Sequence, residues 1–279
     1  MSLPRLIVLL SLVAGSAHAA GDGWLVGAGL ELDTDDGVRA SLLAGVGLGD
    51  ATWLSGAAAT STVDYPARGS SDTLYLDVEM DHRFDPVGIS VGAAYWGDPD
   101  ILDSNDLRAS VYWDNDKVMI AADYEFRDFD FIIPPSDFFP GREFAFDASG
   151  IGARLRFRLG DTATLRLSAM NYDYSIGFRP DLTRDAISLI TVSRLSPINN
   201  LIDGRAGVGL DINAGVRRWQ ISVLSWKGAL DRSRTRSYTL RFLTPLGGNT
   251  DIELGVGFDD SDIYDDATYF SLYLYFYGD

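Results

Sequence analysis

The stretch IGARLRFRLGD, residues 151–161, places an arginine at every second position and an apolar side chain between each pair. A period of two is the period of a β-strand, in which successive side chains point to opposite faces. Arg154, Arg156 and Arg158 therefore share one face, while Leu155 and Phe157 lie on the other. The pattern predicts a strand that separates an apolar environment from an aqueous one.

The same alternation recurs along the chain in stretches bounded by turn residues. Fourteen are found: WLVGAGLEL, VRASLLAGVGL, ATWLSGAAATS, LYLDVEMDH, GISVGAAYW, LRASVYWDN, VMIAADYEF, the opening stretch, TATLRLSAMNY, GRAGVGLDI, RRWQISVLSW, SYTLRFLT, DIELGVGF and TYFSLYLYF. The sequence thus predicts an all-β protein of about fourteen antiparallel strands, with twelve or sixteen as alternatives.

The connections between these stretches alternate between short and long. The short ones read GD, RFDP, DND, LGDT, NAG and PLGGN, and the long ones cover residues 61–72, 97–106, 128–149, 175–203, 227–234 and 259–267. Short turns at one end and long loops at the other are typical of an up-and-down barrel in an outer membrane. Residues 185–195, DAISLITVSRL, have strand-like content but lie inside the longest connection. We assign them to an external loop, because an extra strand there would leave the C-terminus on the wrong side of the membrane.

The two faces of the strands indicate lipid outside and water inside. Apolar faces of about fourteen strands could not fill a barrel interior, since side chains fill that space only near eight strands. A two-sheet secreted sandwich is the alternative, but the polar faces carry glycines, which suit a crowded concave lumen. These are Gly27, Gly29, Gly45, Gly47, Gly152, Gly207, Gly209, Gly255 and Gly257. Aromatic residues gather near strand ends, as interfacial girdles require: Trp24, Trp53, Trp113, Tyr124, Phe126, Trp219, Phe258 and Phe276.

The last stretch, TYFSLYLYFYGD, places Phe270, Leu272, Leu274 and Phe276 in one file. It resembles the C-terminal signature of bacterial outer-membrane β-barrels, although Gly278 and Asp279 follow the final aromatic residue. The resemblance covers the mature chain, rests on the pattern, and points to no specific family. It implies a transmembrane antiparallel barrel that contacts outer-membrane lipid and lipopolysaccharide, and that needs periplasmic chaperones and the barrel-assembly machinery during biogenesis.

The first twenty residues, MSLPRLIVLLSLVAGSAHAA, have the layout of a secretory signal peptide. Arg5 precedes an apolar segment that is too short to span a bilayer, and the A-x-A pattern at 17–19 follows. We predict a signal peptide at 1–19, with cleavage after Ala19 or, alternatively, Ala20. Residues 20–279 then form a single barrel domain in the outer membrane of a Gram-negative bacterium.

Composition excludes several classes of function. The chain has no cysteine, which excludes disulfides, thiol chemistry and zinc–thiolate sites. Its net charge of −17 argues against nucleic acid as a partner, because phosphate binding needs a clustered basic surface. We expect no cofactor and a monomer.

The polar face of the predicted barrel carries charges of both signs. The candidate lumen-lining and selectivity residues are Asp77, Glu79, Asp81, Arg108, Asp123, Glu125, Arg127, Arg154, Arg156, Arg158 and Arg166. We predict an arginine-rich sector, partly neutralised by Asp123 and Glu125 on the adjoining strand, that faces an acidic sector around residues 77–81. Charged ladders of this kind can select passing solutes, or they can form an internal salt-bridge network that only fills the barrel.

Two loops have unusual compositions. Asp33, Asp35 and Asp36 in DTDDG are weak candidates for calcium binding, but a solvated acidic loop is the favoured interpretation because the twelve-residue calcium-loop spacing is missing. The segment 259–266 is a second acidic loop. Residues 129–141, FDFIIPPSDFFPG, are apolar enough to fold into the mouth of the barrel, or to bind an apolar ligand or partner.

An enzyme is the least favoured interpretation. The mature chain has a single histidine, His82, beside the short connection RFDP, where it cannot reach the external lipid surface. No G-x-S-x-G, H-E-x-x-H or phosphate-loop motif occurs. The sequence predicts a porin-like passive channel for small hydrophilic solutes, anions among them; the alternative is a non-conducting barrel that serves as a surface anchor or as the outer component of an export or envelope-maintenance assembly.

Overall fold

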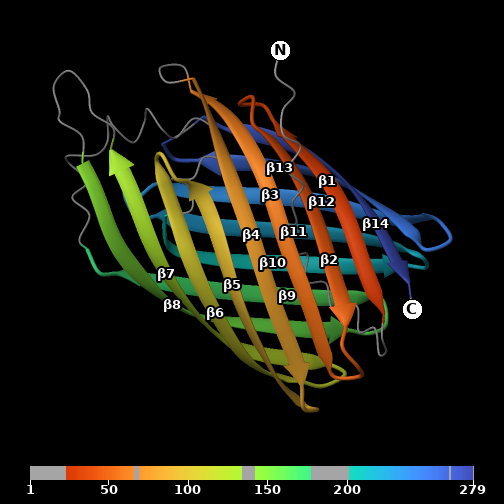
Figure 1. The fold of residues 1–279 in the computed structure, drawn as a ribbon. Coiled ribbons are helices and arrows are strands. Elements are labelled where there is room, and N and C mark those ends of the chain that lie inside the picture. The colour runs from red at the N-terminus through yellow and green to blue at the C-terminus, as the bar shows by residue number, and fades with distance from the viewer. Residues whose placement is uncertain (1–22, 66–68, 134–141, 177–200, 264, 279) are drawn as a thin grey trace.

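The computed structural model describes residues 23–65, 69–133, 142–176, 201–263 and 265–278, which form one closed barrel (Figure 1). Its strands are β1 (Trp24–Asp33), β2 (Val38–Gly47), β3 (Thr52–Tyr65), β4 (Gly69–Arg83), β5 (Val87–Asp98), β6 (Leu102–Asp114), β7 (Val118–Ile133), β8 (Arg142–Leu159), β9 (Ala163–Tyr174), β10 (Ile202–Ala214), β11 (Arg217–Gly228), β12 (Arg234–Gly247), β13 (Thr250–Ser261) and β14 (Ala267–Gly278). The predicted all-β barrel of about fourteen antiparallel strands is confirmed.

Closure of the barrel is made by β1 and β14, which pair antiparallel from Trp24 opposite Gly278 to Asp33 opposite Tyr269. Every other strand pairs with its neighbours in sequence, so the sheet has no free edge. No helix in the described ranges has the length and hydrophobicity to cross a bilayer. The predicted signal peptide at 1–19 and the segment 185–195 lie outside the described residues.

Short turns lie at the end of the barrel where β1 begins, at Trp24, and where β14 ends, at Gly278. Gly160 and Gly215 take the left-handed conformation there, with φ of +73° and +65°. Tight hairpins need such a φ, and glycine adopts it without a steric cost. The predicted alternation of short and long connections holds only in part. The predicted long connections 61–72, 97–106 and 128–149 are wrong in extent, because the strands continue into them and leave only residues 66–68, 99–101 and 134–141 between strands.

The hydrophobic pattern inverts in these extended strand ends, which explains the error. Within the lower part of β7, Tyr124 faces outward and is 47% exposed. Higher on the same strand Asp128 and Asp130 are exposed on the outer face, while Phe129 and Phe131 pack inside the barrel. Above the bilayer the outer face meets water, so the apolar face turns inward as in a soluble barrel.

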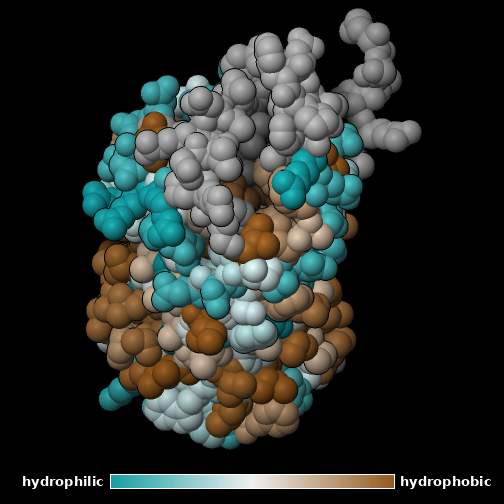
Figure 2. All heavy atoms as spheres, turned by 90° about the vertical axis from the view of Figure 1, so that its left-hand side faces the viewer, coloured by the Kyte–Doolittle hydropathy of each residue, from teal (hydrophilic) through white to brown (hydrophobic). Residues whose placement is uncertain are grey.

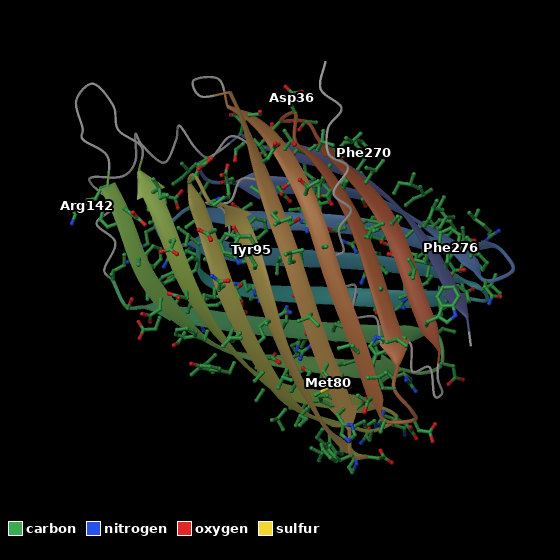
Figure 3. All side chains as sticks on the ribbon, viewed as in Figure 1. Asp36, Met80, Tyr95, Arg142, Phe270 and Phe276 are labelled. Atoms are coloured by element: carbon green, nitrogen blue, oxygen red, sulfur yellow. The ribbon has the colours of Figure 1, made fainter. Side chains whose placement is uncertain are left out.

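The outer surface carries a belt of exposed apolar side chains. On β8, Ile151 is 73% exposed and Leu159 is also exposed, so the apolar face of the opening stretch faces outward. Figure 2 shows hydrophobic residues over the lower part of one face and hydrophilic residues above them. On β14, Phe270 and Phe276 belong to the same outer face (Figure 3). The belt is the surface that lipid would cover.

The predicted aromatic girdle is confirmed for most of its members and wrong for one. Exposed on the outer face are Trp24, Trp113, Tyr124, Trp219, Phe258 and Phe276, and Phe126 lies on the same face, partly exposed. Trp53 instead lies on the lumen side, where a Cβ placed on Gly45 would be 2.5 Å from its ring. Its position in the strand decides this, because Trp53 shares a face with the buried Ser55 and Ala57.

Glycines in the lumen-facing file accommodate tyrosine rings from the next strand. Gly29 lies directly opposite Tyr273, and Gly257 lies directly opposite Tyr269. A Cβ on either glycine would be about 2 Å from the opposing ring, at 2.2 Å and 2.0 Å. The prediction that these glycines line a crowded lumen is confirmed.

Candidate functional site: the charged lumen

The lumen-facing file of β8 carries Arg154, Arg156 and Arg158, the arginines of the opening stretch. Arg154 makes a two-pronged contact with Asp123 of β7, with Nε 2.9 Å from Oδ2 and Nη2 2.8 Å from Oδ1. Arg156 reaches Asp114 of β6, with an Nη2–Oδ2 distance of 2.6 Å. Arg158 is exposed near the end of β8.

Predicted lumen residues on the neighbouring strands also face the interior. Arg166 of β9 contacts Asp211 of β10 at 2.9 Å, and Arg218 of β11 contacts the same carboxylate at 3.0 Å. Arg218 and Asp211 were not among the site residues predicted from the sequence. Together these pairs link the adjacent strands β9, β10 and β11 along the inner wall.

The predicted acidic sector contains an arginine. Arg108 of β6 forms a salt bridge with Asp77 of β4 and lies 3.8 Å from Glu79. It passes over Gly92 of the intervening β5, whose missing side chain leaves room for it. Asp81 accepts a hydrogen bond from the Tyr112 hydroxyl at 2.8 Å. The acidic residues are therefore mostly partnered locally, and the two sectors do not face each other as separate blocks.

Glu125 has different partners from those predicted. Its Oε1 accepts a hydrogen bond from Arg127 Nε at 2.6 Å, and its Oε2 accepts one from Tyr172 at 2.9 Å and lies 3.5 Å from Arg205. Residues of β8 opposite it are small, since Gly150 lies directly across. The expected support of the β8 arginines by Glu125 is wrong; Asp123 of β7 pairs with Arg154, and Asp114 of β6 pairs with Arg156.

Glu125 belongs to a buried polar network that ties five strands together. Arg127 is 5% exposed and donates to Tyr172 at 3.1 Å, with its guanidinium 4.5 Å from the ring centroid. It also lies 3.7 Å from Asp106, which accepts hydrogen bonds from Trp96 Nε1 at 2.8 Å and from the Ser104 hydroxyl at 2.5 Å. The charges of this network are compensated inside the barrel, so it stiffens the wall.

An apolar layer lies above this network, toward the end with the long connections. Its buried members come from β3, β5, β6, β7 and β8 and from two connections: Val63, Trp96, Leu102, Phe129, Phe146, Ala148, Leu201 and Leu230. Phe129 and Phe146 stack with ring centroids 4.8 Å apart. Part of the predicted apolar segment 129–141 thus packs inside the barrel as two wall residues, Phe129 and Phe131, whereas 134–141 lie outside the described residues.

In most lumen pairs the arginine is more exposed than its carboxylate. The exposed fractions of the side chains are 45% for Arg154 against 13% for Asp123, and 39% for Arg205 against 4% for Glu125. Arg166 and Arg218 likewise cover the buried Asp211. The carboxylates lie behind, near the wall, and the guanidinium groups face the interior. Although the formal charges of the lumen lining nearly balance, the surface that faces the lumen interior is therefore cationic.

A cavity of about 340 Å³ lies in the lumen below the buried network. Its charged lining consists of Glu79, Arg108, Asp123, Glu125, Arg154 and Arg205. Serines and the apolar side chains of Met170 and Leu224 are among its other lining residues. Of the eleven predicted lumen residues, six do not line this cavity. Conversely, Arg205, Met170 and Leu224 line it but were not among the eleven. A period of two identifies the lumen face but not which residues meet around one cavity.

The acidic loop between β1 and β2 is organised by its own backbone. Asp33 Oδ1 accepts hydrogen bonds from the amides of Asp35 and Gly37 at 3.0 and 2.7 Å. Burial first, and then the nearby carboxylates with Asp33 foremost, together raise the pKa of Asp35 to about 6. Within the described ranges no group of three or more His, Cys, Asp or Glu side chains is arranged to hold a metal ion. Calcium binding by Asp33, Asp35 and Asp36 stays a prediction.

His82 lies at the short-turn end of β4. Its Nδ1 is 2.7 Å from the Thr52 hydroxyl oxygen, and its ring meets Phe84 edge-on with centroids 4.4 Å apart. These contacts give it a structural role at the end opposite the long connections.

No protein-family model matches the sequence, and no curated protein matches it either. Solved structures with a similar fold include CymD, a monoaromatic hydrocarbon channel, with a TM-score of 0.56 at 9% identity over 92% of this chain and 88% of that one. A loop-deletion mutant of OmpT, an outer membrane protein of Vibrio cholerae, gives a TM-score of 0.52 at 12% identity over 93% and 100%. The KdgM porin gives 0.45 at 10% identity over 90% and 98%. By fold, this chain is an outer-membrane β-barrel of the kind that porins and channels adopt.

Proposed function

We propose that this protein is a passive, porin-like channel for small hydrophilic solutes, with a preference for anions. The observation that carries the proposal is the exposure of the lumen arginines in front of their buried carboxylate partners. Rings and ladders of charge tune the selectivity of pores, and exposed guanidinium groups attract anions while repelling cations. The fold that the chain shares with CymD, described as a channel, supports the passage of solutes as its class of function.

We expect the barrel to reside in the outer membrane after export, as a monomer in contact with lipid and lipopolysaccharide. The apolar belt and the aromatic residues at its margins support this location. Insertion there would require periplasmic chaperones and the barrel-assembly machinery. We expect neither nucleic acid nor a cofactor as a partner, and no enzymatic activity.

Ion selectivity in planar bilayers tests the proposal. The double variant Arg156→Ala/Arg158→Ala removes two cations from the lumen near the short-turn end, so its reversal potential in a KCl gradient should move toward that of a non-selective pore. Arg236→Ala is the matched control: Arg236 lies on the outer face of β12, 3.9 Å from Asp260, and its loss should leave the reversal potential unchanged. Identical reversal potentials for the double variant and the native protein would leave the arginines only a filling role.

A non-conducting barrel, serving as an anchor or as an outer assembly component, is the second candidate. The apolar layer and the buried network beneath it favour this candidate, because they fill part of the lumen. Liposome swelling separates the two. Solute flux into vesicles that contain the barrel supports the channel, and vesicles that behave as empty ones support the non-conducting barrel.

A further inference from the structure

The lumen cavity contains an apolar surface that a purely hydrophilic pore does not need. Leu224 of β11 faces the lumen and is 37% exposed. It lies over Gly207 of β10, where a Cβ would be 3.2 Å from Leu224 Cδ1. Met170 of β9, on the other side of β10, lines the same cavity. An exposed leucine beside a methionine in a charged interior is the kind of surface that covers the apolar part of a ligand.

Arg205 supplies the adjoining cation. Its Nη2 lies 3.6 Å from the Met170 sulfur, directly across the β9–β10 pair, so the cation and the apolar surface meet. Its contact with Glu125 is long, at 3.5 Å, and Glu125 is also satisfied by Arg127 and Tyr172. Arg205 is therefore less committed to its partner than Arg154, which holds Asp123 through two short hydrogen bonds.

We propose that this cavity binds small amphiphilic carboxylates, whose carboxylate contacts Arg205 and whose apolar body lies on Leu224 and Met170. This proposal rests on the proposed function and names the class of anion that the channel retains. A guanidinium group matches the planar carboxylate, and Arg154 and Arg108 add positive charge around the cavity. The volume of about 340 Å³ is at the lower end for ligand sites and suits an acid of benzoate size.

The combination of a cation and an apolar surface in the cavity should distinguish amphiphilic carboxylates from other small solutes. Acetate can occupy the cationic part of the cavity but covers little of Leu224. Sugars and inorganic phosphate gain nothing from an apolar wall. Benzoate makes both contacts, and burial of its ring against two apolar side chains should strengthen binding by about tenfold over acetate.

Calorimetric titration of the full-length mature barrel in detergent, with benzoate and with acetate, tests the proposal. Benzoate should bind about tenfold more tightly than acetate. Leu224→Ser should remove most of that difference while acetate affinity stays the same. Arg205→Gln should weaken both ligands, and its partner Glu125 keeps Arg127 and Tyr172. Heat-modifiable migration in gels confirms that each variant is folded.

Leu25→Ser is the matched control, because Leu25 faces the lumen from β1 but does not line the cavity. It also corrects for partition of benzoate into the detergent. Equal affinities for benzoate and acetate, or equal effects of Leu224→Ser and Leu25→Ser, would overturn the proposal. Binding in detergent does not depend on conduction. A barrel that conducts without preferring benzoate therefore loses only this inference, whereas one that binds benzoate but passes no solute contradicts the proposed channel.

Discussion

The pKa of Asp35 is shifted by the surroundings of its carboxyl group. The residue lies in the β1–β2 loop beside Asp33 and Asp36, and the latter marks that end of the barrel in Figure 3. Burial and the neighbouring carboxylates raise its pKa from 3.8 to about 6. Because the folded-state pKa lies above the unfolded value, the folded loop binds a proton between these two values that the unfolded chain releases. Stability therefore falls as the pH rises from 3.8 to about 6, and the loss is complete above that window.

Asp35→Asn should remove this loss. The variant should unfold at a higher temperature than the native protein at pH 7.5, and the two should unfold at similar temperatures near pH 3, where Asp35 is protonated in both states. The measurement is thermal unfolding in lipid vesicles across this pH range. A difference that does not change with pH would contradict the origin assigned to the shifted pKa.

Cross-strand glycine–tyrosine pairs let tyrosine rings lie flat against the inner wall of the barrel. Tyr269 lies over Gly257, and its hydroxyl is 2.6 Å from the Thr239 oxygen and 3.1 Å from the Ser237 oxygen. The ring thus covers the glycine of β13 and reaches β12. The same arrangement joins β1 to β14 through Gly29 and Tyr273, so it secures the closing pair of the barrel.

Gly257→Ala should destabilise the barrel by about 1–3 kcal/mol, since the new methyl group overlaps the Tyr269 ring and forces it away from its hydrogen-bond partners. Urea unfolding in lipid vesicles measures the change. Gly56→Ala is the matched control, because a Cβ there meets only the Asp77 carbonyl oxygen at an ordinary 3.5 Å. If both variants lose the same stability, the ring contact is not the cause.

The whole molecule is a cylinder whose chemistry changes along its axis. In the lower part the outer face is apolar and the inner face is charged; higher up, on β7 and β8, the inner face becomes aromatic and the outer face becomes polar. A belt of lipid around the lower part explains both patterns. The arginine-covered cavity then lies inside the belt, and the aromatic layer lies toward the end with the long connections.

Leu155→Arg tests this arrangement. Leu155 lies at the middle of the outward apolar run of β8 between Ile151 and Leu159, so an arginine there should destabilise the folded barrel in bilayers by about 2–4 kcal/mol. Ala145→Arg, on the outer face of the same strand above the belt, should cost much less. Equal costs, measured by denaturant titration in phospholipid vesicles, would show that lipid does not surround this part of β8.

The alternation of residues 151–161 and of thirteen similar stretches was enough to predict about fourteen strands and the lumen position of the arginines, because a strand's period of two is local. It overestimated the length of the connections at 61–72, 97–106 and 128–149, where the strands continue. It could not predict that Arg108 crosses β5 to reach Asp77, or that Glu125 turns to Arg127 and Arg205, which is 80 residues away. Those contacts depend on the register in which neighbouring strands pair, and the Arg108–Asp77 contact also depends on the absence of a side chain at Gly92. The loop at 128–149 was predicted too long because β7 and β8 continue beyond the apolar belt, where Phe129 and Phe131 turn inward. The exposure of most lumen arginines over their carboxylates, from which the proposed anion preference follows, exists only once the strands curve around a common interior.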